Sequence, residues 1–195
     1  MDLDAAELRV LGCLVEKQRT TPDAYPLSLN ALRLACNQST NRDPVVDYDE
    51  ATIRTALAGL SRRNWARLAS GRGSRAVKYR HLLDEALGLD GAELSLLAVL
   101  MLRGAQTPGE LKQRSERLHG FASVPEVIEA LERLAERELV LRLPRRPGQK
   151  EERYAHRLGE EGDEPPAPPA EDGRLAALER RLAEVEARLD ALEGR

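Results

Sequence analysis

The sequence has 195 residues, a formal net charge of −3, and few aromatic side chains: one Phe, one Trp and four Tyr. This length suits one or two domains with extensions, and a composition rich in Leu, Ala, Arg and Glu favours helices over a large sheet. Because acidic residues occupy the start of the chain and no apolar run approaches the roughly 20 residues of a membrane span, we expect a cytoplasmic protein without a membrane partner.

The first predicted element is a helix whose opening recurs later in the chain. Residues 3–8 (LDAAEL) match residues 89–94 (LDGAEL), an offset of 86, and Asp4 and Asp90 are suited to cap the two helices. The apolar positions of the first copy share one helical face: Leu8, Leu11, Leu14 and Val15. This similarity predicts an internal repeat.

A middle helix and a third helix follow in each copy. The middle helices are predicted over about 28–36 and 108–118, with Thr107 as the cap of the second. Residues 20–37 before and within the first of them are either a connector with a helix cap or a docking surface. The third helices align at an offset of 74 and each bury one stripe: Ile53, Ala56, Leu57 and Leu60, and Val127, Ala130, Leu131 and Leu134. The first copy is therefore longer by 12 residues, which fall in the loop 37–49.

Each third helix is followed by a short apolar strand, a basic turn and a second strand, over residues 65–81 and 139–156. Three helices and a hairpin in this order are typical of the winged helix, a helix-turn-helix with an added β-wing. We therefore predict a mainly α protein with small β-wings, built from two tandem winged-helix domains, residues 1–83 and 84–158.

The end of the chain predicts a linker and a coiled coil. Residues 159–173 are rich in Pro and acidic residues, as disordered linkers are, and residues 174–195 carry a heptad pattern. Arginines at the g positions and glutamates at the e positions attract only in a parallel pair, so we expect a parallel homodimer. The alternative is a lone helix that folds back on a domain. The a and d positions form the predicted oligomerisation seam: Leu175, Leu178, Leu182, Val185, Leu189 and Leu192.

The first copy carries the charge pattern of a nucleic-acid interface. Between residues 51 and 83 there are eight basic residues and no acidic one, which indicates either a polyanion-binding surface or a solvated basic face. In a helix-turn-helix the recognition helix enters the major groove and a wing reaches the backbone. The predicted DNA contacts lie on the outer face of the third helix and on the wing: Thr52, Arg54, Thr55, Arg62, Arg72, Arg75 and Lys78.

The second copy has a different outer face. Glu129, Glu132 and Glu136 replace the small and basic residues of its third helix, and phosphates would repel them. We expect this domain to pack on the first or to bind a protein. Two functions follow for the chain: a non-enzymatic, regulatory DNA-binding protein, or a winged-helix interaction scaffold that binds no DNA.

Motifs for catalysis, metals or cofactors are absent from the sequence. The three histidines His81, His119 and His156 are far apart, and two of them end equivalent strands of the repeat, which favours a structural role over a metal site. Cys13 and Cys36 form no CxxC pair and are expected to be small buried residues in a reducing compartment. We predict neither a metal nor a cofactor.

Several segments between residues 3 and 158 carry a resemblance to a known family: GCLVEKQ (12–18), TTP (20–22), YPLSLNA (25–31), ACNQ (35–38), NRDPV (41–45), LRGAQTPGEL (102–111) and RLPR (142–145), the last followed by Tyr154. In these segments the sequence resembles the YceH family of bacterial proteins. This resemblance implies a tandem winged-helix fold in the bacterial cytoplasm, and it brings no biochemical function and no site residues with it.

Overall fold

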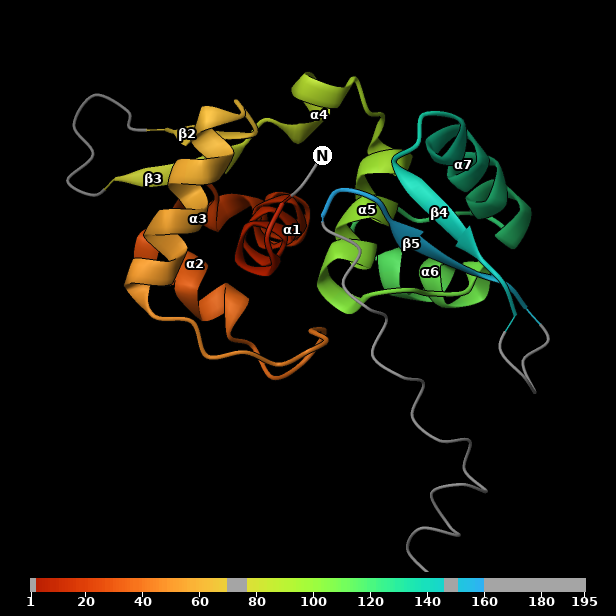
Figure 1. The fold of residues 1–195 in the computed structure, drawn as a ribbon, viewed down its shortest axis with the longest axis horizontal. Coiled ribbons are helices and arrows are strands. Elements are labelled where there is room, and N and C mark those ends of the chain that lie inside the picture. The colour runs from red at the N-terminus through yellow and green to blue at the C-terminus, as the bar shows by residue number, and fades with distance from the viewer. Residues whose placement is uncertain (1–2, 70–76, 146–150, 160–195) are drawn as a thin grey trace, which may run out of the picture. The chain divides into compact units, whose positions relative to one another are not determined.

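The computed structural model describes residues 3–69, 77–145 and 151–159, which belong to one compact unit spanning Met1–Glu160 (Figure 1). The predicted linker and coiled coil lie outside the described residues, except for Gly159. The tip of the first predicted wing, with Arg72 and Arg75, also lies outside them.

The first copy of the repeat contains three α-helices and a small sheet. The N-caps follow the expected chemistry: the Asp4 carboxylate accepts from the Glu7 backbone N–H at 2.8 Å, and the Ser28 hydroxyl accepts from the Ala31 N–H at 3.3 Å. The elements are α1 (Ala5–Thr20), the 3₁₀ turn η1 (Pro22–Ala24), β1 (Leu27–Ser28), α2 (Leu29–Cys36), α3 (Glu50–Arg62), β2 (Ala66–Leu68) and β3 (Lys78–His81).

The second copy follows the same order after a short connecting helix, α4, which the sequence pattern did not predict. Asp90 and Thr107 each form a complete capping box at the start of their helices, as their positions indicated. The middle helix ends at Ser115, three residues before its predicted end. The elements are α4 (Leu83–Leu87), α5 (Gly91–Arg103), α6 (Pro108–Ser115), α7 (Val124–Glu136), β4 (Val140–Leu143) and β5 (Arg153–His156).

Two small antiparallel sheets complete the fold. In the first sheet the strand order is β1-β3-β2. Tyr79 of the central strand β3 lies opposite Leu27 of β1 on one side and opposite Leu68 of β2 on the other. In the second, β4 pairs with β5, and Gln106 forms an isolated bridge to Tyr154 where the first copy has β1. The prediction of a mainly α protein with small sheets is confirmed.

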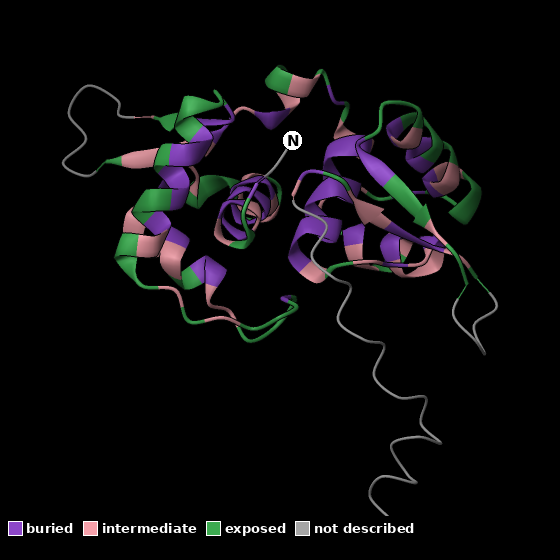
Figure 2. Ribbon diagram, viewed as in Figure 1, coloured by how far each residue is buried: buried purple, intermediate pink, exposed green. Residues whose placement is uncertain are grey.

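The helices α1 and α5 lie side by side at the centre of this unit (Figures 1 and 2). Residues 10–15 of α1 and residues 93–102 of α5 are buried without interruption. A one-sided apolar face was expected for the first helix, but α1 packs on its own sheet and helices and also on α5. Contact on two sides requires a helix that is apolar nearly all round.

The loop 37–49, which is the insertion of the first copy, is held by two buried arginines. Arg9 donates to the carbonyl oxygens of Cys36 at 3.2 Å and Pro44 at 2.6 Å. Arg42 donates to the Ala35 carbonyl at 3.1 Å and to the Glu16 carboxylate at 2.7 Å. The backbone N–H of Asp43 then donates to the Leu102 carbonyl at 2.9 Å, so the insertion reaches α5 of the other copy.

Candidate nucleic-acid interface

Helix α3 presents one buried stripe and one exposed face, as its spacing predicted. The Asp49 carboxylate caps it by accepting from the Thr52 N–H at 2.8 Å, and all four predicted core positions, from Ile53 to Leu60, are at most 3% exposed. Thr55 and Ala58 lie on the exposed face. This face holds small side chains, which allow a close approach by another molecule.

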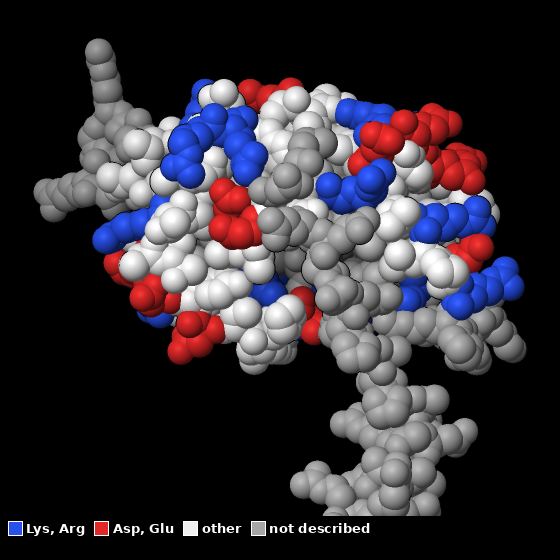
Figure 3. Space-filling model, viewed as in Figure 1, with Lys and Arg blue, Asp and Glu red and all other residues white. Residues whose placement is uncertain are grey.

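Charge is distributed unevenly along α3. Its first turn is acidic, with exposed Asp47, Asp49 and Glu50 before or within it. Its last turn leads into exposed Arg62 and Arg63. Figure 3 shows basic side chains gathered where the end of α3 approaches β2, and acidic side chains near the start of α3. A polyanion would therefore be attracted to the C-terminal half of α3 and repelled from its N-terminal end.

The sheet beside α3 adds a second group of cations. In the antiparallel register Arg67 lies directly opposite Arg80, and Lys78 lies two residues from Arg80 on the same face. Arg80 pairs with Glu85. Like charges directly opposite on neighbouring strands destabilise a sheet unless a counter-charge is present. This arrangement is a basic sheet face suited to an anionic partner.

The predicted contact residues are placed as follows. Arg54, Thr55 and Arg62 are exposed, whereas Thr52 and Lys78 are half-buried. Arg54 forms an ion pair with Glu50 at 3.0 Å, in which both side chains are largely exposed. Such surface pairs contribute little and exchange readily with other partners.

Two cations of this surface were not among the predicted contacts, namely Arg67 and Arg80. The alternation of strand side chains in residues 66–68 and 78–81 is the signal that could have identified them, because Arg67, Lys78 and Arg80 share one face. Among the described residues, no ion pair involves Arg62, Arg67 or Lys78. We call Arg62, Arg67, Lys78 and Arg80 the basic surface.

The corresponding surface of the second copy is acidic. Glu129, Glu132 and Glu136 are all exposed on α7. Arg133, between them, is directed to the other side, where it pairs with Asp90 at 3.3 Å and with Glu93 at 3.2 Å. The exposed faces of the two third helices, α3 and α7, therefore carry different charges.

His81 and His156 occupy equivalent sites at the ends of β3 and β5. The Nδ1 atom of each accepts a hydrogen bond from the backbone N–H two residues later, Leu83 at 3.3 Å and Leu158 at 3.4 Å. In His81 the Nε2 proton is donated to the Gln18 Oε1 at 2.6 Å. Burial lowers the pKa of both imidazoles to about 4, so they are neutral at pH 7.

Neither a metal cluster nor a membrane-spanning helix occurs in the part of the chain that the structure describes. No group of three or more His, Cys, Asp or Glu side chains is arranged there to hold a metal ion. No helix there has both the length and the apolar character that a bilayer crossing requires.

Comparison with known proteins defines the family. The family model described as "Protein of unknown function, DUF480" matches residues 3–149. A UPF0502 protein from Shewanella amazonensis is 45% identical over 210 residues, covering 98% of both chains. A UPF0502 protein from Geobacter sulfurreducens is 49% identical over 195 residues, covering 93% of this chain and 89% of the relative.

The UPF0502 protein YceH from Escherichia fergusonii is 45% identical over 206 residues, covering 98% of this chain and 96% of the relative. The chain therefore belongs to the DUF480 family, which includes the UPF0502 protein YceH. The resemblance inferred from the sequence segments is confirmed.

Proposed function

We propose that this chain is a non-enzymatic, cytoplasmic DNA-binding protein with a regulatory role, built from two tandem winged-helix domains, 1–83 and 84–158. Three helices followed by an antiparallel hairpin, present twice, support this fold. The first domain contacts duplex DNA through the C-terminal half of α3 and the β2–β3 sheet. The second domain packs on the first through α5.

The observation that carries the proposal is the pairing of Arg67 with Arg80 across the sheet, with Lys78 on the same face. Arg80 pairs with Glu85, so a polyanion would supply negative charge to Arg67 and Lys78, which have no ion pair among the described residues. Arg62, exposed at the end of α3, adds a cation on the helix that precedes this sheet. The basic surface therefore suits the phosphate backbone of a duplex.

The charge pattern on α3 also supports a particular binding mode. In a helix-turn-helix the N-terminal residues of the recognition helix read base edges, but here Asp49 and Glu50 occupy that end. Phosphate contacts from Arg62, Arg67 and Lys78 carry no sequence information directly. We therefore expect strong salt dependence and weak discrimination between sequences.

The test is duplex binding by the full-length chain at two or more salt concentrations. Replacing Arg62, Arg67 and Lys78 together by Ala should weaken binding and reduce the salt slope by about 1 per lost phosphate contact. The matched control removes three exposed cations of the second copy, Arg142, Arg145 and Arg157, and should retain most of the affinity and slope.

Two results would contradict this function. One is no detectable binding of any duplex by the unmodified chain at about 50 mM salt, where non-specific binding is favoured. The other is an equal loss of affinity in the triple variant and in its control. Equal loss would mean that net charge, and not the basic surface, determines the interaction.

A protein-interaction scaffold is the second candidate. It is favoured by the carboxylates Glu129, Glu132 and Glu136 on the outer face of α7, which suit a basic protein surface and repel DNA. Changing all three to Gln should leave duplex binding unchanged if the first proposal holds. A chain that binds no duplex but loses a protein partner on this change would instead be a scaffold.

A further inference from the structure

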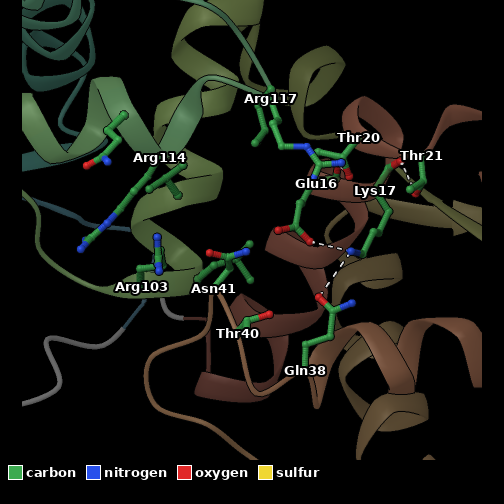
Figure 4. A pocket seen from close by; sticks show the side chains of 14 residues that line it. Glu16, Lys17, Thr20, Thr21, Gln38, Thr40, Asn41, Arg103, Arg114 and Arg117 are labelled. Atoms are coloured by element: carbon green, nitrogen blue, oxygen red, sulfur yellow. Dashed lines mark hydrogen bonds and ion pairs between the residues drawn. The ribbon is translucent and has the colours of Figure 1, made fainter.

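A cavity of about 720 Å³ lies at the junction of the two copies (Figure 4). Its walls come from the end of α1, the loop after α2, the end of α5, and α6 with the turn that follows it. These segments are far apart in the sequence and meet because α1 packs against α5 and the loop 37–49 reaches α5. The volume falls within the roughly 300–1,000 Å³ typical of small-molecule sites.

The floor of this cavity is apolar and its rim is polar. Val99 and Leu102 of α5 are buried beneath it, at 4% and 3% exposure, and Leu118 is partly buried beside them. The Thr40 and Asn41 side chains line the rim from the loop after α2 (Figure 4). A ligand here would have both an apolar body and polar groups to satisfy.

Cations dominate the charged side chains that line the cavity: Lys17, Arg103, Arg114 and Arg117, against the single carboxylate of Glu16. Glu16 is already neutralised, because it accepts from Arg42 at 2.7 Å and from Lys17 at 3.2 Å.

Arg114 is paired with Glu110 at 3.3 Å. Within the described part of the chain, Arg103 and Arg117 have no ion pair. Two arginines thus remain without a carboxylate partner there.

The electrostatic environment of Arg103 agrees with this excess of positive charge. Partial burial is the main reason that the pKa of Arg103 is lowered, and repulsion from Arg114 and Arg42 lowers it further. The carboxylates of Asp43 and Glu110 offset this lowering only in part. An anion placed between these guanidinium groups would relieve the repulsion.

We propose that this cavity binds a phosphorylated small molecule of nucleotide size. Its phosphate groups would be held by Arg103 and Arg114 on one side of the cavity and by Arg117 on the other (Figure 4), because guanidinium groups form charge-assisted hydrogen bonds with phosphate oxygens. Its organic part would lie on Val99 and Leu102. The inference is independent of DNA binding, since the basic surface on α3 and β2–β3 contributes no residue to this cavity.

A ligand in this cavity would contact both copies of the repeat at once. Lys17 and Asn41 come from the first copy, and Arg103 and Arg117 come from the second. A ligand that binds only the folded state raises the melting temperature, and the rise grows as the ligand concentration exceeds the Kd. The ligand therefore stabilises the packing of one copy on the other.

The experiment measures binding of ATP and of uncharged adenosine to the full-length chain by calorimetry, together with the melting temperature. We expect ATP to bind and to raise the melting temperature, and adenosine to do neither. The double variant Arg103→Gln and Arg117→Gln should raise the Kd for ATP about tenfold or more, because two charge-assisted contacts are lost. The matched control, Arg142→Gln with Arg145→Gln, removes two exposed cations outside the cavity and should leave the Kd within about twofold.

Four outcomes would overturn the proposal, three of them in the ATP measurements themselves. These three are no binding of ATP, equal binding of ATP and adenosine, or an equal loss of ATP affinity in the double variant and its control. A fourth outcome is that a short duplex displaces ATP and that duplex binding also requires Arg103 and Arg117. This result would assign these arginines to DNA binding and would likewise overturn the proposal. The variant lacking Arg62, Arg67 and Lys78 tests duplex binding only, because none of these residues lines the cavity. The two proposals can therefore fail separately.

Discussion

Gly59 of α3 lies where the Glu7 side chain reaches across from α1. A β-carbon at position 59 would lie 1.8 Å from Glu7 Oε1 and 3.0 Å from its carboxyl carbon. In the second copy Arg133 occupies the equivalent position and pairs with Glu93, the counterpart of Glu7. The equivalent glutamates of the two copies therefore have different neighbours: Glu7 occupies the space left by Gly59, and Glu93 pairs with the Arg133 guanidinium.

Replacing Gly59 by Ala should destabilise the protein by about 1–2 kcal/mol, although Ala is normally better than Gly within a helix. Glu7 is 7% exposed and its carboxylate caps α1 through the Asp4 N–H at 3.1 Å, so displacing it disrupts the capping box. The free energy of unfolding by denaturant measures the effect.

The control for this prediction is the double variant Glu7→Ala with Gly59→Ala. Without the carboxylate, a methyl group at position 59 has room, so the second substitution should cost nothing when added to the first. An additive loss in the double variant would show that the contact with Glu7 is not the cause.

His81 makes stability depend on pH. Its pKa is about 4 in the folded protein against 6.5 for the free side chain, so the unfolded chain binds more protons between these values. Stability should therefore fall as the pH decreases from about 6.5 to 4, by on the order of 2–3 kcal/mol at 1.36 kcal/mol per unit. Denaturation curves between pH 7.5 and 4 measure this loss.

The variant His81→Asn is the comparison for this prediction. Its amide oxygen can replace Nδ1 as acceptor for the Leu83 N–H, but it does not titrate. The variant should lose less stability than the unmodified chain over the same pH range. Parallel curves for the two proteins would assign the pH dependence to other groups.

At the scale of the element, charge distinguishes helices with nearly identical apolar patterns. The stripes of α3 and α7 are buried alike, yet α3 ends in exposed arginines and α7 carries three glutamates on its outer face. Because side-chain charge is independent of the stripe that fixes the helix in the core, the two copies can keep one fold and present different surfaces.

The wing belongs to the same scale, and one variant removes its two tip arginines together with Lys78 of β3. Replacing Arg72, Arg75 and Lys78 by Ala should weaken duplex binding and flatten its salt dependence, by about 1 unit of slope per lost phosphate contact. Arg72 and Arg75 lie outside the described residues, so this variant tests the wing prediction made from sequence. Unchanged binding would exclude the wing tip and Lys78 and leave α3, Arg67 and Arg80 as the candidate contacts.

At the scale of the whole molecule, Gly12 permits the central helices to meet. A β-carbon at position 12 would lie 2.9 Å from Leu102 Cγ and 3.4 Å from Met101 Cβ of α5. Gly12→Leu should therefore lower the free energy of unfolding by about 1–3 kcal/mol through overpacking. Ala58→Leu, on the exposed face of α3, is the matched control and should change it little. Equal effects would mean that this helix contact does not limit stability.

The predicted coiled coil concerns the assembly of the full chain. Arginines at g and glutamates at e, from Arg174 to Glu193, attract only in a parallel pair, so we propose a homodimer. Light scattering should show a dimer for the full chain and a monomer for a truncation ending at Gly162. A monomer in both cases at tens of micromolar would exclude this seam.

Much of the local structure could be predicted from the sequence. The caps at Asp4, Asp90 and Thr107 and the buried stripes of α3 and α7 depend on residues a few positions apart, so the pattern alone determines them. The alternation of side chains along β2 and β3 also places Arg67, Lys78 and Arg80 on one face of the sheet. The helical spacing predicted which side chains of α3 point away from the core: Arg54, Thr55 and Arg62 are exposed and Thr52 is half-buried. Their contact with DNA stays a prediction.

Features that depend on distant segments were decided only by the tertiary structure. The burial of α1 on two sides follows from its contact with α5, whose opening lies 86 residues away in the repeat. The buried Arg42 and the cavity lined by Lys17 and Arg103 require the loop 37–49 to fold onto α5. Neither periodicity nor spacing specifies such contacts, because both describe neighbours along one helix or strand and not the approach of two elements in space.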